Sequence, residues 1–249
     1  MAQGRESNYD HHISIFSPQG HLYQVEYCMK SANSTGLTTI AIRGADSTAF
    51  VTQKKVPDRL IDPTSVSNVY TITPKVGVVV TGQPADARAQ VARIRQEAHE
   101  FKFSNGFDMP VYLLAKRVAD LSQLRTQRAG MRLLACFTTI IGVDDEKGPQ
   151  LYQVDPAGMF FPFKAFAAGA KKDEANNWLE RHVEEFPAMS SEDIIRQAII
   201  CLQHVLSADF RGTEIEVGVV QGENRFTTLS PEEIEAHLSA ISEQDMDGA

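Results

Sequence analysis

Paired histidines and acidic runs are the side chains whose types and spacing could bind a cation or move a proton. His11 and His12 are adjacent, but neighbouring side chains of an extended segment point to opposite sides, and no Cys or carboxylate lies at a ligand spacing from them. The run Asp144-Asp145-Glu146 is typical of a solvated loop, and Glu184-Glu185 of a helix end. No G-x-S-x-G, Walker or G-x-G-x-x-G motif is present. We therefore predict no metal and no cofactor.

The stretch Tyr9–Tyr27 is an extended arm followed by a turn and a helix. Ser17-Pro18-Gln19-Gly20 predicts a β-turn, because Pro presets φ at the second position and Gly tolerates the last. Apolar residues then recur at spacings of three and four from Leu22 to Ala32, which predicts a short amphipathic helix that Gly36 closes. Such an arm cannot bury itself, so we expect it to pack on another surface.

Composition excludes several function classes. The 249 residues carry a formal net charge of -8, which argues against a nucleic-acid partner held through phosphates. The longest mainly apolar run, Leu133 to Val143, is too short to span a bilayer, and the N-terminus has no secretory apolar core. Three widely spaced cysteines form neither a metal pattern nor a disulfide framework. We expect no nucleic-acid or membrane partner and a location in the cytoplasm and nucleus.

Hydrophobic periodicity predicts runs of strands that alternate with helices. The predicted strands are Leu37–Arg43, Thr48–Thr52, Val69–Thr73, Val76–Thr81, Leu134–Val143, Leu151–Val154, Met159–Ala168 (interrupted by Pro162), Ile215–Val220 and Phe226–Leu229. After the arm, one helix is predicted after Gly82 as far as Asn105, and a second begins at Pro110. Three further predicted helices span Lys172–Glu185, Ser191–Leu206 and Ser230–Ile241. Because Val76–Val80 is apolar throughout, we expect both faces of that strand to be covered.

This order of elements favours an α+β fold over a doubly wound sheet. It permits two stacked sheets with helices on both outer faces. We expect one domain over residues 9–241, preceded by a flexible polar tail at 1–8 and followed by a disordered acidic tail at 242–249.

The arm also resembles a family signature. The order Tyr-Asp, two residues, Ile-Ser-Ile-Phe-Ser-Pro, then Gly, two residues, Tyr-Gln-Val-Glu-Tyr is similar to that of α-type proteasome subunits. The similarity continues through Asp155–Gly158, Phe163–Ala165 and Glu214–Val220, and the last of these, with Gln53–Asp58, most resembles the alpha type-6 branch. This resemblance selects the four-layer α/β/β/α sandwich of N-terminal-nucleophile hydrolases.

The resemblance also bears on catalysis. β-Type subunits of the family expose an N-terminal threonine after a Gly at the head of the first strand, and its hydroxyl attacks the substrate. Here the corresponding junction is Gly36-Leu37, and Ser67-Asn68-Val69 stands near the third strand where a Lys that could serve as base is expected. The resemblance therefore implies a non-catalytic subunit. The alternatives are an active N-terminal-nucleophile threonine peptidase and a free-standing binding module of the same fold.

The family builds rings of seven α-subunits that stack on β-subunit rings. This implies α- and β-subunit neighbours and a regulatory particle or other activator as partners, with roles in ring assembly, pore gating and activator docking during ubiquitin-dependent degradation. The residues that match the family's gate cluster are Tyr9, Asp10, Pro18 and Tyr27. His11 replaces the Arg that usually follows Tyr-Asp. Asn68 replaces a Lys that binds activator C-termini, which implies a weak activator pocket.

Overall fold

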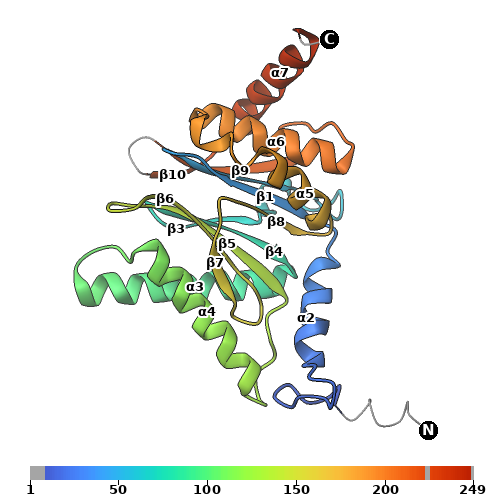
Figure 1. Cartoon of the computed structure of the whole chain (residues 1–249), viewed down its shortest axis with the longest axis vertical. Coiled ribbons are helices and arrows are strands. Elements are labelled where there is room, and N and C mark those ends of the chain that lie inside the picture. The colour runs from blue at the N-terminus through green and yellow to red at the C-terminus, as the bar shows by residue number, and fades with distance from the viewer. Residues whose placement is uncertain (1–8, 222–224, 248–249) are drawn as a thin grey trace.

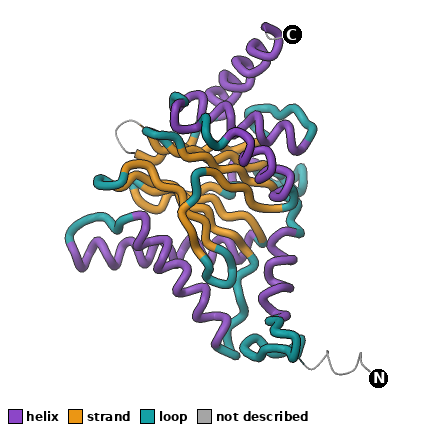
Figure 2. Tube along the Cα trace, in the orientation of Figure 1, coloured by secondary structure: helices purple, strands orange, loops and turns teal. Residues whose placement is uncertain are grey.

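The computed structural model describes residues 9–221 and 225–247 (Figure 1). Its centre consists of two stacked five-stranded sheets, with helices outside both (Figure 2). The four-layer α/β/β/α sandwich expected from the sequence is confirmed. No helix of the described ranges is both long and apolar enough to cross a membrane.

The first sheet has the strand order β10-β9-β2-β1-β8, and all its pairs are antiparallel. Its strands are β1 (Thr38–Arg43), β2 (Thr48–Gln53), β8 (Ala165–Gly169), β9 (Ile215–Gln221) and β10 (Arg225–Thr228). In the central pairs, Ile40 of β1 lies opposite Val51 of β2, which in turn lies opposite Val217 of β9.

The second sheet has the order β3-β4-β5-β6-β7 and is also antiparallel throughout. Its strands are β3 (Val69–Thr73), β4 (Val76–Gly82), β5 (Cys136–Asp144), β6 (Gly148–Val154) and β7 (Phe160–Pro162). Every residue of β4 is buried, which confirms that both faces of this apolar strand are covered.

Two groups of helices cover the outer faces. Helices α3 (Pro84–Asn105) and α4 (Val111–Gln127) pack on the second sheet. Helices α5 (Lys172–His182) and α6 (Ser191–Leu206) pack on the first sheet, and α7 (Pro231–Asp247) packs against α6. Two short 3-10 turns, Pro63–Ser65 and Phe186–Ala188, complete the connections.

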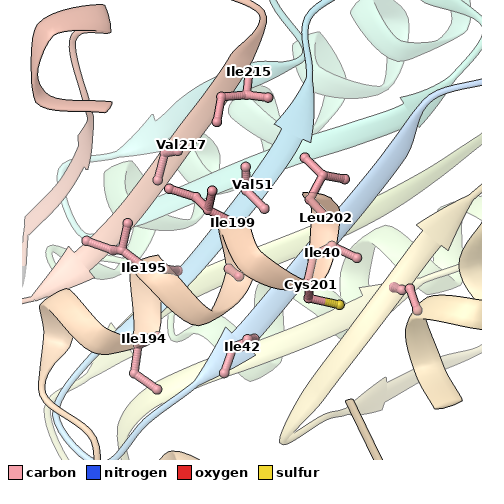
Figure 3. Packing of buried hydrophobic residues seen from close by; sticks show 14 of the residues in the cluster. Ile40, Ile42, Val51, Ile194, Ile195, Ile199, Cys201, Leu202, Ile215 and Val217 are labelled. Carbon is pink, nitrogen blue, oxygen red and sulfur yellow. The ribbon is translucent and has the colours of Figure 1, made fainter. Parts of the chain in front are cut away.

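Three apolar layers hold the sandwich together. The outer layer on the first sheet joins α6 to β1, β2 and β9 through Ile194, Ile199 and Leu202, which lie against Ile40, Val51 and Val217 (Figure 3). A second layer joins α3 and α4 to the other sheet. Between the sheets, Phe50 and Phe226 pack with ring centroids 6.0 Å apart. Burial of these side chains supplies most of the stabilising free energy.

Local signals set several helix ends where they were predicted. Gly106 ends α3 with φ 81°, and Ser190 begins α6 by accepting a hydrogen bond from the Asp193 N–H. Ser230 and Glu233 form a capping box at α7: each side chain accepts from the backbone N–H of the other. Asp108 precedes α4, and its carboxylate pairs with Lys102 at 2.8 Å rather than capping the helix.

Two predictions need correction. The acidic segment from Ser242 is not disordered as far as Asp247, because α7 continues through it on good helix formers such as Glu243 and Gln244. The helix predicted to end at Glu185 ends at His182, and Phe186 turns inward to full burial. Residues 1–8 and 248–249, the remainder of the two predicted tails, lie outside the described residues.

Candidate functional site

Helix α2 (Tyr23–Asn33) lies across one end of the sandwich and touches both sheets (Figure 1). Its fully buried Ala32 packs with Phe137 of β5 and Ala168 of β8. Two polar contacts add to this packing: the Cys28 thiol donates to the Leu134 carbonyl at 3.4 Å, and the Gln83 amide donates to the Ser31 carbonyl at 3.4 Å. The expectation that the arm packs on another surface is confirmed for its helix.

The turn before α2 forms as predicted. The Gly20 N–H donates to the Ser17 carbonyl at 2.9 Å, and Gly20 has φ 84°, a value that favours glycine. The Ser17 hydroxyl accepts from the His21 N–H at 3.1 Å. Just before the turn, Phe16 is 64% exposed, so this part of the arm presents an apolar side chain to its surroundings.

Asp10 and Tyr27 are brought together by the fold of the arm. Partial desolvation raises the pKa of Tyr27, and the nearby Asp10 carboxylate raises it further. The Gln24 amide donates to the Asp10 backbone carbonyl, which ties the start of the arm to α2. The Tyr23 ring stacks on the Tyr27 ring at 6.2 Å. Sequence reasoning missed Gln24 and Tyr23, although both lie inside the signature.

The other two predicted gate residues are placed differently. Tyr9 is half-buried, and its carbonyl accepts a 3.4 Å hydrogen bond from the His12 N–H. Pro18 is exposed within the Ser17–Gly20 turn, so it shapes the chain reversal. The contacts of the cluster therefore involve Asp10, Gln24 and Tyr27.

The head of β1 is where a nucleophile would stand in an active enzyme of this fold. Leu37 occupies it and is 9% exposed. The preceding Gly36 carbonyl accepts from Lys55 Nζ at 2.7 Å. On the neighbouring strand, a Cβ added to Gly169 would lie 1.9 Å from the Leu37 carbonyl oxygen, so the two chains pass closely here.

Two threonines follow Leu37, and both lie within the strand. Thr38 N–H donates to the Gln53 amide oxygen at 3.0 Å. Thr39 Oγ1 lies 2.8 Å from the hydroxyls of both Thr52 and Thr81. Each backbone nitrogen is part of a continuous peptide chain that joins α2 to β1. This arrangement holds the Thr39 hydroxyl in a structural network between the sheets.

Asn68 lies at the entrance to β3 and is half-buried. Its backbone N–H donates to Glu216 Oε2 at 2.9 Å, and its side-chain amide donates weakly to the Gln53 carbonyl at 3.5 Å. A 520 Å³ cavity opens beside it, and its lining includes Ser67 and Val69 on either side but not Asn68 itself. The Asn68 side chain is therefore directed away from this cavity.

The buried carboxylate of Asp86 holds the segment Arg132–Ala135, against which α2 packs. Asp86 accepts two hydrogen bonds from Arg132 at 2.7 Å and one from the Ala135 N–H at 2.8 Å. The Arg132 hydrogen bonds hold the pKa of Asp86 below its ordinary value. Burial raises the pKa of the Cys28 thiol to about 11 and that of Cys136 to about 12, so both are protonated at neutral pH. These thiols therefore act as packing groups.

Within residues 9–221 and 225–247, no three His, Cys, Asp or Glu side chains gather into a set that could hold a metal ion. His11 and His12 are both exposed on the arm.

Comparison with known proteins identifies the family. A four-layer sandwich preceded by a helix-bearing arm is the arrangement of a proteasome subunit, and the family model described as proteasome subunit matches residues 33–220. A second model, which describes the N-terminal signature of A-type proteasome subunits, matches residues 9–30. The chain therefore belongs to the proteasome subunit family and to its α type, whose members are generally non-catalytic parts of a threonine protease complex.

Relatives that match along nearly the whole chain support the same family assignment. The chain is 47% identical to the probable alpha type-1 proteasome subunit of Schizosaccharomyces pombe, over 98% of this chain and 100% of the relative. It is 44% identical, with the same coverage, to the alpha type-6 proteasome subunit of Caenorhabditis elegans. It is 37% identical to the alpha type-1 proteasome subunit of Trypanosoma brucei brucei, over 95% and 91% of the two chains. The resemblance to the alpha type-6 branch is consistent with these relatives.

Proposed function

We propose that this chain occupies one position in the seven-membered α ring of the proteasome core particle. There it contributes to ring assembly, gates the axial pore and helps activators to dock in ubiquitin-dependent protein degradation. The observation that carries this proposal is the arm, which runs without a break from Tyr9 through α2 into β1 and is packed over both sheets. An active enzyme of this fold needs a free amine at the head of β1.

The chain supplies no nucleophile of its own in this proposal. Leu37 has no hydroxyl, and the hydroxyl of Thr39 is bound between two other threonines. In the assembled particle, peptide hydrolysis is then catalysed by β-subunits of the adjacent ring. The alternative, an active threonine peptidase, would need cleavage after Gly36 to expose a nucleophile, and the residue after Gly36 is Leu37.

The gate in this proposal is the polar segment at residues 1–8, and its position is set by the residues that follow. In this proposal Asp10, through its contacts with Tyr27 and Gln24, anchors the chain just after that segment. Tyr9 accepts a hydrogen bond from the His12 N–H beside Asp10, and Pro18 shapes the reversal before α2. In this proposal the activator pocket to which this chain contributes binds weakly, because Asn68 lacks an ammonium group.

The partners proposed are the two α neighbours, the β-subunits below and a regulatory particle or other activator above. The exposed Phe16 and the outer side of α2 are suited to contact a neighbour, since large obligate interfaces have apolar centres. The net charge of -8 supports protein partners over nucleic acid. We propose that the particle works in the cytoplasm and nucleus.

Native mass spectrometry of complexes captured from cell extract through an affinity tag on this chain tests the proposal. We expect the chain in particles that also contain β-type subunits and hydrolyse peptides. Recovery of the tagged chain only as a monomer would overturn the proposal and favour a free-standing module. An untagged strain processed in parallel controls for particles that bind the resin by themselves.

A further inference from the structure

A small basic cavity lies at the end of the sandwich opposite α2. It encloses about 310 Å³ and is lined by Arg43, Gly44, Ala45, Lys147, Pro149, Lys164, Val183 and Pro187. β1 begins beside α2 and ends at Arg43, and the β5–β6 hairpin that carries Lys147 points away from α2 (Figure 1). Three of these lining residues are cations and none is an acid. This is unusual for a chain of net charge -8.

Backbone hydrogen bonds hold the three cations near one another. The Arg43 N–H donates to the Lys164 carbonyl at 2.8 Å, which joins the end of β1 to the β7–β8 connection. The Lys147 N–H donates to Asp144 Oδ1 at 3.2 Å, which fixes the β5–β6 turn. The cations thus come from three separate connections whose geometry is set before any ligand binds.

Two carboxylates near the cavity are engaged elsewhere, and a third pairs only weakly with one of its cations. Asp145 pairs with Lys75 at 2.6 Å, outside the cavity. The Asp144 carboxylate accepts backbone N–H groups of its own turn. Glu184 reaches Lys164 at only 3.4 Å, and its side chain is 86% exposed, so this pair is weak.

Arg43 has the most restricted position of the three cations. It is half-buried, and within the described residues no carboxylate lies within 4.0 Å of its guanidinium. Lys147 Nζ lies 5.8 Å from the centre of the Tyr112 ring, and Lys147 lines both this cavity and a neighbouring one that contains Tyr112. Like charges around one cavity repel, so an anion placed among them lowers the electrostatic free energy.

We propose that this cavity binds a compact, soluble, multiply charged phosphate compound. A guanidinium offers parallel donors that match phosphate oxygens, and ammonium groups add point charges around it. Pro149, Val183 and Pro187 close the sides with rigid or branched apolar groups. A cavity of 310 Å³ accommodates a few linked phosphate groups and excludes a folded partner. The site is independent of the gate, because it lies at the other end of the domain.

Titration calorimetry of the full chain with sodium tripolyphosphate, at fixed ionic strength, tests this site. We expect saturable binding to one site and weaker binding of orthophosphate. The double substitution Arg43→Gln with Lys164→Gln should weaken tripolyphosphate binding by at least about tenfold, because it removes two charged hydrogen bonds. The matched control is Lys30→Gln with Arg59→Gln, which removes the same charge from exposed positions elsewhere and should leave the affinity unchanged.

Three outcomes would overturn the proposal. They are an absence of saturable binding to the unmodified chain, an equal loss of affinity in the control variant, and equal affinities for orthophosphate and tripolyphosphate. Should the double variant fail to fold by circular dichroism, Lys147→Gln replaces it, since Lys147 lies on a hairpin turn. That single variant should also weaken tripolyphosphate binding, and an unchanged affinity would count against the site.

Discussion

The carboxylate of Asp10 raises the pKa of the Tyr27 hydroxyl, so the Tyr-Asp pair that begins the described arm is close to the residue that ends Tyr-Gln-Val-Glu-Tyr. Between them the chain makes the Ser17–Gly20 reversal and enters α2. Tyr27 lies on a helix that is itself anchored on both sheets. The contact therefore joins the start of the described arm to the body of the domain.

The first prediction concerns this contact. Asp10→Ala should lower activator-stimulated peptide hydrolysis by the assembled particle about 2- to 10-fold, because the contact between its partly exposed carboxylate and the Tyr27 hydroxyl is lost. Tyr27→Phe should have a similar effect. Tyr23→Phe is the matched control, because it removes a hydroxyl and leaves the ring that stacks on Tyr27. Turnover is measured at saturating activator with particles of equal assembly yield.

If stimulated rates in the Asp10→Ala and Tyr27→Phe particles equal those of the wild type, these residues only hold the arm in place. The gating role would then have to be dropped. Activator binding, measured separately, should be unchanged in all three variants, since none of them touches the region of Asn68.

The second prediction concerns the head of β1. The purified chain should gain no covalent adduct from an electrophile that captures N-terminal threonines, as measured by intact-mass spectrometry. Leu37→Thr should also remain unmodified, because α2 stays joined to the strand and no free amine is present to act as base. A β-type subunit treated in parallel is the positive control. An adduct located at Leu37, Thr38 or Thr39 by peptide mapping would contradict the non-catalytic assignment.

The third prediction concerns Asn68. Asn68→Lys should tighten binding of an activator C-terminal peptide to the assembled particle, since a carboxylate gains about 1.5–3 kcal/mol from a charged hydrogen bond and less from a neutral one. Asn68→Gln is the neutral control and should change little. The nearby Glu216, whose carboxylate accepts the Asn68 N–H, will hold part of the new ammonium and reduce the gain. Fluorescence anisotropy of a labelled peptide measures the affinity.

Unchanged peptide affinity in Asn68→Lys would mean that this position does not face the activator. This outcome would agree with the direction of the Asn68 side chain, whose amide donates to the Gln53 carbonyl and does not line the 520 Å³ cavity.

The fourth prediction concerns Asp86 and acid stability. Its pKa in the folded chain is lowered by Arg132, so its contribution to stability is present above the unfolded pKa of about 4 and is lost as the pH falls through the folded value. Asp86→Asn should therefore lower the free energy of unfolding by about 1–2 kcal/mol at neutral pH, a figure reduced because the Arg132 side chain is 70% exposed.

Thermal unfolding of wild type and Asp86→Asn, measured from neutral pH down to about pH 3, checks this sign. The two melting temperatures should converge as the pH falls below about 4. Asp120→Asn is the control, because that carboxylate pairs with Lys116 on the exposed side of α4. A constant difference at all pH values would show that Asp86 acts by packing rather than by its charge.

The sequence by itself determined the local features of this protein. The turn at Ser17–Gly20, the helix after it, the Ser190 and Ser230 caps and the Gly106 stop all follow from short-range chemistry, as do the two buried faces of β4. The arm signature likewise indicated the family, and the sequence places Leu37, which has no hydroxyl, at the head of β1. These signals are readable because each depends on neighbours within a few residues.

The tertiary structure alone decided how the strands divide between two sheets. Phe160–Pro162 and Ala165–Gly169 are neighbours in sequence, yet the first pairs with β6 and the second with β1. Hydrophobic periodicity states which residues are buried but not which distant strand covers them, because pairing depends on chain closure and on packing of whole layers. The Asp10–Tyr27, Asp86–Arg132 and Arg43–Lys164 contacts have the same origin: each joins groups that only the folded chain brings within hydrogen-bond reach.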